Sequence, residues 1–132
     1  MKKEIIGVIT LLVLDIIWVI AYMGERYKVM IPKIQCGTDM ETNIPYAALS
    51  YLLMVIGLLL FVLPNIRKSH LIQDSLLYGA VFGLVLYGVY DLTAAAVIKD
   101  WDMKLAAADM AWGAFVMFAA AVVGGYFQED DS

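Results

Sequence analysis

The amino-acid sequence predicts an all-α protein, a bundle of four transmembrane helices with both termini on the same side of the membrane. Of its 132 residues, 63% are hydrophobic, and the mean hydropathy is +0.80, whereas soluble domains are about half apolar. Four apolar runs have the length of roughly 20 residues that a helix needs to cross a bilayer. Such runs form helices in lipid, because their backbone groups must bond within the segment. We therefore predict a single integral membrane domain over residues 1–132.

The four predicted spans follow one another with short connections. They cover approximately residues 5–23, 46–63, 76–98 and 105–127. An N-terminal signal peptide is the alternative for the first span, since Lys2 and Lys3 resemble its charged start. However, the apolar run is long, Asp15 interrupts it and no small-residue cleavage pattern follows Met23. We expect the first span to remain in the protein.

An even number of spans places both termini on one side, which we name side A; the opposite side is side B. Lys and Arg residues divide almost equally between the two sides, so the positive-inside rule does not orient the chain. The longest connector, residues 24–45, lies on side B. Pro32 and Pro45 are expected to interrupt a long helix there. A short interfacial segment or lid and a disordered polar loop are both consistent with its composition.

Three aspartates lie within predicted spans: Asp15, Asp91 and Asp109. An ionised carboxylate in a bilayer costs roughly 2.5–3.5 kcal/mol on insertion scales, so such residues are functional candidates by default. Asp-x-x-Trp occurs twice, as Asp15–Trp18 and Asp109–Trp112, and this spacing places both side chains on one helix face. Because indole donates and carboxylate accepts, an aspartate of one helix could bond to the tryptophan of its neighbour.

Most polar side chains in the spans lie in the half nearer side B, and the other half is nearly free of them. Tyr87 and Asp91 share a face through their spacing of four. This distribution predicts a pocket that opens towards side B above an apolar floor. The candidate ligand-binding or proton-relay residues are Asp15, Trp18, Tyr87, Tyr90, Asp91, Thr93, Asp109 and Trp112.

The alternative to a functional site is structural, since hydrogen bonds between helices hold membrane bundles together at about 0.6 kcal/mol each. Converging carboxylates without an intramembrane Lys or Arg favour function, because like charges in a medium of low dielectric cannot all remain ionised. Small residues in the third and fourth spans predict close helix packing. The residues assigned to packing are Gly79, Gly83, Gly113 and Gly124.

Other chemistries lack support in the sequence. One histidine, His70, and one cysteine, Cys36, argue against zinc, haem and thiolate clusters. Carboxylates could bind Mg²⁺ or Ca²⁺, but no dedicated metal motif is present, so we expect no metal and no cofactor. A net charge of −4 without a large basic patch argues against nucleic acid. No nucleophile–base arrangement or nucleotide-binding motif occurs.

Several short motifs along the chain form a recognisable set. They are Leu14-Asp15-x-x-Trp18, Tyr51-Leu52-Leu53, Leu77-Tyr78-Gly79-Ala80-x-Phe82-Gly83, Tyr90-Asp91-Leu92-Thr93, Lys99-x-Trp101 and Asp109-x-x-Trp112-Gly113. Together they resemble a family of small four-helix predicted membrane proteins, found mainly in bacteria and catalogued as a domain of unknown function. The family commonly has Asn after Tyr-Asp-Leu-Thr, where this chain has Ala94. The resemblance implies the four-span topology and the same site residues, and it implies no particular activity.

Three functions fit these observations. The favoured one is binding or transport of a cation, a proton or a small polar ligand in the one-sided pocket. The second is a membrane-embedded lipid-modifying enzyme, or its accessory subunit, with an aspartate as general acid or base. The third is a non-catalytic assembly partner that packs through its glycine faces, in a homo-oligomer or with another membrane protein. The sequence favours a non-enzyme over an enzyme, and the lipid bilayer is the expected surrounding.

Overall fold

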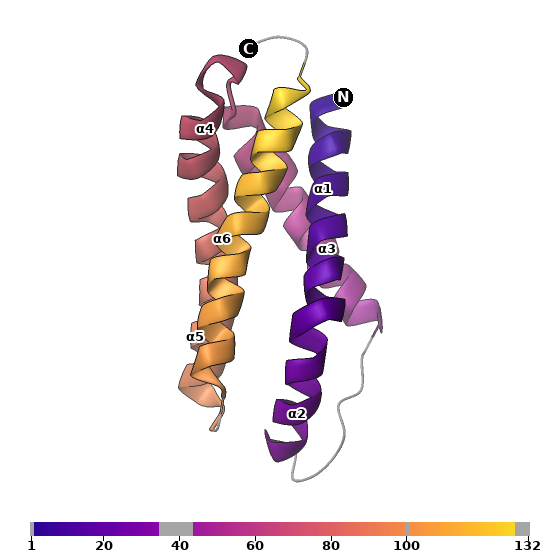
Figure 1. The fold of residues 1–132 in the computed structure, drawn as a ribbon, viewed down its shortest axis with the longest axis vertical. Coiled ribbons are helices and arrows are strands. Elements are labelled where there is room, and N and C mark those ends of the chain that lie inside the picture. The colour runs from indigo at the N-terminus through magenta and orange to yellow at the C-terminus, as the bar shows by residue number, and fades with distance from the viewer. Residues whose placement is uncertain (1, 35–43, 100, 129–132) are drawn as a thin grey trace.

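The fold of residues 2–34, 44–99 and 101–128 is described by a computed structural model, and these residues contain no strand. Four helices are long and apolar enough to cross a membrane: Lys2–Ile31, Ile44–Asn65, Lys68–Val97 and Met103–Tyr126. This confirms the predicted all-α class and the four apolar spans. The first residues of the first helix and the last residues of the fourth lie at the same end of the bundle, as the topology requires (Figure 1).

Three of the four spans contain a π-helical segment, and the fourth is a single α-helix. The first span consists of α1 (Lys2–Trp18), η1 (Val19–Met23) and α2 (Gly24–Ile34), and the second of α3 (Ile44–Gly57), η2 (Leu58–Val62) and η3 (Leu63–Asn65). The third consists of η4 (Lys68–His70), α4 (Leu71–Asp74), η5 (Ser75–Ala80) and α5 (Val81–Val97), and the fourth is α6 (Met103–Tyr126). The π-helical segments are η1, η2 and η5. Such segments often mark functional positions in helices.

The first helix is longer than the sequence predicted, because α2 continues it through Pro32 to Ile34. The prediction that Pro32 interrupts the helix was wrong. Pro32 removes one backbone hydrogen bond, that of its missing N–H, and only two helical residues follow it, so little of the helix depends on that bond. The extension is also held by packing, since Met23 and Met30 form an apolar cluster with Leu105 near side B. The part of the connector beyond Ile34, residues 35–43, lies outside the described residues.

The third helix also begins earlier than predicted, since Lys68–Asp74 is helical rather than part of a loop. Asp74 is 3% exposed. Its carboxylate accepts hydrogen bonds of 2.9 Å from the backbone N–H and from Nε of Arg67, and one of 3.1 Å from Nη2. A bidentate pair of this kind fixes the turn into the third helix.

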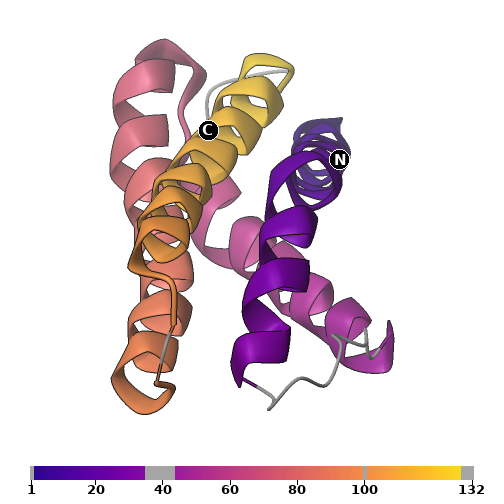
Figure 2. The ribbon, with the colours of Figure 1, turned by 60° about the horizontal axis from the view of Figure 1, so that its bottom comes forward.

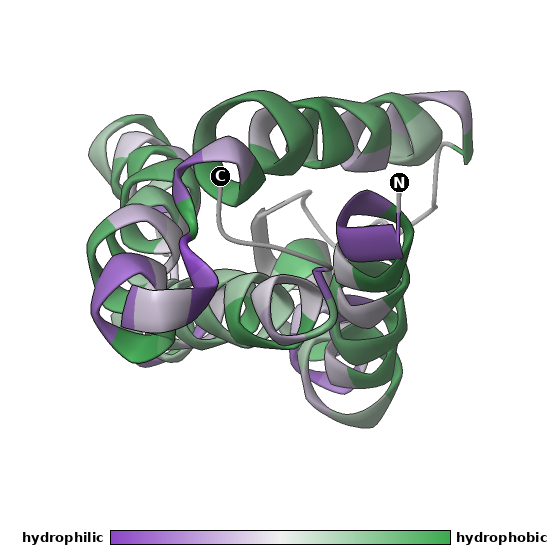
Figure 3. Ribbon diagram, turned by 90° about the horizontal axis from the view of Figure 1, so that it is seen from above, coloured by the Kyte–Doolittle hydropathy of each residue, from purple (hydrophilic) through white to green (hydrophobic). Residues whose placement is uncertain are grey.

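Helix α6 lies between α5 and α1 and packs against both (Figures 1 and 3). In its most apolar stretch 39% of the residues are buried, against 17–22% in the other spans, so α6 is the central helix. Helix α3 crosses behind α1 and diverges from α5 towards side B (Figures 1 and 2). Figure 3 shows apolar residues around the outer sides of the bundle, where lipid would surround it.

The half of the bundle nearer side A is filled by apolar side chains. The core there includes Leu58, Val62, Leu63, Val116 and Met117, each at most 1% exposed. This packed half forms the apolar floor that the sequence predicted beneath the polar residues.

Side A is closed by a hydrogen-bonded clasp between the two ends of the chain. Lys3 is 9% exposed, and its Nζ donates to the carbonyl of Ile66 and to Oε1 of Gln128, each at 3.1 Å. Gln128 Nε2 donates to the same Ile66 carbonyl at 3.2 Å. The start of α1, the turn before the third helix and the end of α6 are therefore joined.

The topology can be tested with the single native cysteine. Cys36 lies between the first two spans, so a membrane-impermeant maleimide should label it only from side B. In the double variant Cys36→Ser, Ser132→Cys, the new thiol should react only from the opposite side. Intact and inverted vesicles provide the two sides for each protein. Labelling of both thiols from one side would contradict the four-span topology.

Candidate functional site

Asp15 is the point at which all four spans meet through hydrogen bonds. This aspartate of α1 is 5% exposed. Its carboxylate accepts from the hydroxyl of Tyr87 on α5 at 2.7 Å and from that of Tyr51 on α3 at 2.8 Å. The third donor is the indole of Trp112 on α6, at 3.0 Å. Three donors satisfy most of the hydrogen-bonding capacity of a carboxylate, and Asp15 therefore ties the bundle together.

The two Asp-x-x-Trp motifs bond to each other across the α1–α6 interface. Trp18 Nε1 donates to Asp109 Oδ1 at 3.3 Å, while Trp112 donates to Asp15. The indole rings of Trp18 and Trp112 stack between these bonds, with centroids 4.7 Å apart and planes 4° from parallel. Because the helices run in opposite directions, each motif supplies the acceptor for the donor of the other.

Asp91 on α5 is unlike the other two aspartates. Its side chain is 0% exposed. No N–H or hydroxyl group of the described residues donates to its carboxyl oxygens, and the neighbour within hydrogen-bonding reach is the carboxyl group of Asp109. The two groups therefore also interact electrostatically. Buried polar groups are nearly always hydrogen-bonded, so a buried carboxyl group without a donor suggests that a bound group supplies the interaction.

A cavity of about 600 Å³ lies in the half of the bundle nearer side B, at the depth of these residues. Ligand cavities commonly measure about 300–1,000 Å³. It is lined by all four spans, with carboxylates from α1 and α6, tyrosines from α2, α3 and α5, and apolar residues mainly from α3. The lining residues are Asp15, Val19, Tyr27, Tyr46, Ala47, Leu49, Ser50, Tyr51, Leu53, Met54, Leu86, Tyr87, Tyr90 and Asp109.

The structure brings most of the predicted site residues to this region. Asp15, Tyr87, Tyr90 and Asp109 line the cavity, and the Trp18–Trp112 stack is bonded to two of them. Asp91 is buried beside Asp109. Thr93 is exposed on α5 and does not line the cavity.

The set of predicted site residues omitted three tyrosines that the structure places there. Tyr51 bonds to Asp15, Tyr46 lines the cavity from α3, and Tyr27 lines it from α2. Tyr51 lies at the same depth as the aspartates in the sequence, and that depth was a usable signal. Tyr27 had no such signal, because its segment was expected to lie outside the membrane helices.

The predicted packing glycines lie at close contacts between helices. A Cβ on Gly83 would overlap the carbonyl oxygen of Gly113, and one on Gly113 would overlap the ring of Tyr87. At Gly79 and Gly124, a Cβ would lie 2.9 Å from the carbonyl oxygens of Met117 and Lys3 respectively. Side chains at these positions would push α5 and α1 away from α6.

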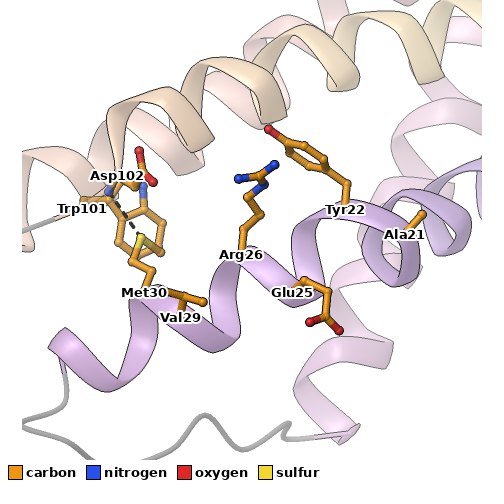
Figure 4. Close-up of a pocket in the computed structure, with 8 residues that line it drawn as sticks. All are labelled: Ala21, Tyr22, Glu25, Arg26, Val29, Met30, Trp101 and Asp102. Atoms are coloured by element: carbon orange, nitrogen blue, oxygen red, sulfur yellow. Dashed lines mark hydrogen bonds between the residues drawn. The ribbon is translucent and has the colours of Figure 1, made fainter.

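A second cavity, of about 720 Å³, lies nearer side B between α2 and the residues before α6. Figure 4 shows Arg26 beside Tyr22, with Met30 facing Trp101 and Asp102. The Arg26 guanidinium lies 4.5 Å from the Tyr22 ring centroid, and the backbone N–H of Asp102 donates to the sulfur of Met30 at 3.3 Å. Arg26 and Glu25 are both exposed here, so this cavity resembles a solvated interfacial surface more than an enclosed site.

Metal-binding groups are not clustered in the part of the chain that the structure describes. Within residues 2–34, 44–99 and 101–128, no group of three or more His, Cys, Asp or Glu side chains is placed to hold an ion. Of the three aspartates near the cavity, Asp15 already accepts from three donors. Asp91 and Asp109 are the pair that could still interact with a ligand.

Four apolar spans around a buried carboxylate cluster define a small multi-pass integral membrane protein. The chain belongs to the DUF2177 family, described as predicted membrane protein, whose model matches residues 2–126. This confirms the resemblance drawn from the motifs. No curated protein and no solved structure matches the chain.

Proposed function

We propose that this protein binds a ligand carrying a positively charged group, and that Asp91 and Asp109 hold this group in the half of the bundle nearer side B. The observation that carries the proposal is Asp91, a fully buried carboxyl group beside a second one, Asp109, with no N–H or hydroxyl donor among the described residues. A cation in contact with Asp91 would supply the missing interaction.

The surroundings of Asp91 favour a cation over other ligands. Asp109 is its neighbour and accepts a 3.3 Å bond from Trp18. Two adjacent carboxylates repel each other at low dielectric, and a cation between them relieves that repulsion. No Lys, Arg or His is among the residues that line the cavity.

Aromatic side chains add to this preference. Five tyrosines line the cavity: Tyr27, Tyr46, Tyr51, Tyr87 and Tyr90. Aromatic rings attract organic cations through their electron-rich faces, and such surroundings suit ammonium groups in particular. We therefore favour an ammonium-bearing ligand over a hydrated inorganic ion.

Access to the site is one-sided in this conformation. The apolar core and the Lys3–Gln128 clasp separate the aspartates from side A. The ligand therefore reaches the site from the B half, and a transport role would require the packed half to open.

Asp91→Asn tests the proposal directly, since the amide keeps the shape of the side chain and removes its charge. Propylammonium is a suitable probe, titrated calorimetrically into purified protein in neutral maltoside micelles. We expect saturable binding by the unchanged protein and affinity at least about tenfold lower in Asp91→Asn, equivalent to about 1.4 kcal/mol. The protein should remain folded, because no N–H or hydroxyl donor loses its acceptor and the amide can still donate to Asp109.

Glu25→Gln provides the matched control, because it also removes one negative charge but lies on an exposed side chain outside the cavity around the aspartates. Its affinity for propylammonium should stay within about twofold of the unchanged protein. Equal affinities in Asp91→Asn and the unchanged protein would refute the role of Asp91.

A further inference from the structure

We infer that the ligand is a single-chain amphiphile with a cationic head, an alkylammonium in chemical class, which enters sideways from the bilayer between α3 and α5. The head would lie at Asp91 and Asp109, and the chain would extend along α3. This inference rests on the proposed function and adds the class of ligand and its route.

The cavity lining has a polar part and an apolar part. Asp15, Tyr87 and Asp109 line it from α1, α5 and α6. The apolar part, which we name the apolar wall, consists of Leu49, Leu53 and Met54 of α3 and Leu86 of α5, and the other α3 lining residues include Tyr46, Ser50 and Tyr51. A compact polar ligand would leave the apolar wall without a partner, whereas a head with an attached hydrocarbon chain would fill both parts.

The apolar wall is open towards the acyl chains of the bilayer. Leu49 is 53% exposed and Leu53 is 68% exposed, although both line the cavity. Helices α3 and α5 diverge at this depth (Figures 1 and 2). Nearer side A the second and third spans approach each other, and the ring centroids of Phe61 and Phe82 lie 6.4 Å apart. The cavity thus continues into the flank of the bundle, so a chain already in the bilayer could enter without crossing water.

Charge selects the head of the amphiphile. The lining residues include two carboxylates, Asp15 and Asp109, and contain no basic side chain. A phosphate or carboxylate head would meet like charge in a low-dielectric region. An ammonium head would meet Asp109 and the tyrosines of the lining, with Asp91 buried directly beside Asp109. Anionic amphiphiles are therefore excluded and cationic ones are favoured.

The test compares two probes with the same head and different chains, propylammonium and dodecylammonium, in neutral maltoside micelles with empty micelles subtracted. The double variant Leu49→Trp, Leu53→Trp places bulk on the apolar wall. We expect it to weaken dodecylammonium binding at least tenfold and propylammonium binding by a clearly smaller factor, because propylammonium has only a short chain to place against this wall.

Leu52→Trp, Ile56→Trp is the matched control, with the same spacing on the same helix. Both of these residues are exposed and neither lines the cavity. The control should bind both probes within twofold of the unchanged protein. Dodecyl sulfate at equal concentration should not compete with dodecylammonium.

The outcomes separate this inference from the proposed function. If the unchanged protein binds propylammonium through Asp91, but the two double variants bind dodecylammonium equally well, the amphiphile is wrong and the cation site stands. Equal competition by dodecyl sulfate would also overturn the cationic head. If neither ammonium probe binds the unchanged protein, the proposed function itself fails.

Discussion

Gly83→Ala should destabilise the bundle more than any other single methyl group added to α5. Its Cβ would overlap the backbone carbonyl oxygen of Gly113 and lie 2.9 Å from Cβ of Met117. A backbone obstacle cannot rotate away, so α5 and α6 must separate. Overpacking commonly costs about 1–3 kcal/mol, and we expect a value at or above the top of that range.

The measurement is the unfolding midpoint in mixed micelles, followed by circular dichroism. Gly88→Ala is the matched control on the same helix, because its Cβ would meet only the flexible end of Met110, at 3.2 Å. The control should unfold near the midpoint of the unchanged protein. Equal loss of stability in both variants would show that the contact between Gly83 and Gly113 does not limit helix approach.

Asp15→Ala should have the second large effect, because it leaves three donors without their acceptor. Tyr87, Tyr51 and Trp112 all donate to this carboxylate. Hydrogen bonds in membranes contribute little each, whereas unpaired buried groups carry larger penalties. For three unpaired donors we expect the free energy of unfolding to fall by roughly 2–5 kcal/mol. Asp15→Asn should lose less, since its carbonyl oxygen still accepts.

Comparing the unfolding midpoints of variants at Asp15 and Asp91 distinguishes a structural role from a binding role. Asp91→Asn removes a buried ionisable group to which no described N–H or hydroxyl donates, so its unfolding midpoint should equal or exceed that of the unchanged protein. The two aspartates would thus show opposite behaviour, with stability depending on Asp15 and cation binding depending on Asp91. Greater destabilisation by Asp91→Asn than by Asp15→Asn would reverse these assignments.

The spans were predictable from the sequence because the bilayer fixes the length and the polarity of a crossing helix. The helix ends were less predictable. The sequence predicted a break at Pro32 and a loop over Lys68–Asp74, and both segments are helical. Met30 packs with the distant Leu105, a contact that a local pattern does not contain, whereas Asp74 pairs with Arg67 only seven residues earlier, and that pairing could have been anticipated.

The site was partly predictable for a related reason. The depth of Asp15, Asp91 and Asp109 follows from the helix rise, and the Asp-x-x-Trp spacing places donor and acceptor on one face. Which aspartate is satisfied does not follow from the sequence. That depends on the rotation of each helix about its axis, which places three donors at Asp15 and none of the described ones at Asp91.

The bonds of Asp15 also order the assembly of the protein during its synthesis. Its three donors belong to α3, α5 and α6, which leave the ribosome in that sequence. The first span therefore enters the membrane with an unsatisfied carboxylate, and each later span brings one donor to it. The Trp18–Trp112 stack and the second Asp–Trp bond form only with the last span. A nascent chain truncated before α6 lacks the Trp112 donor to Asp15 and the Trp18–Asp109 bond. Its aspartate in lipid is then incompletely hydrogen-bonded, and membrane quality control can use this difference to distinguish it from the completed protein.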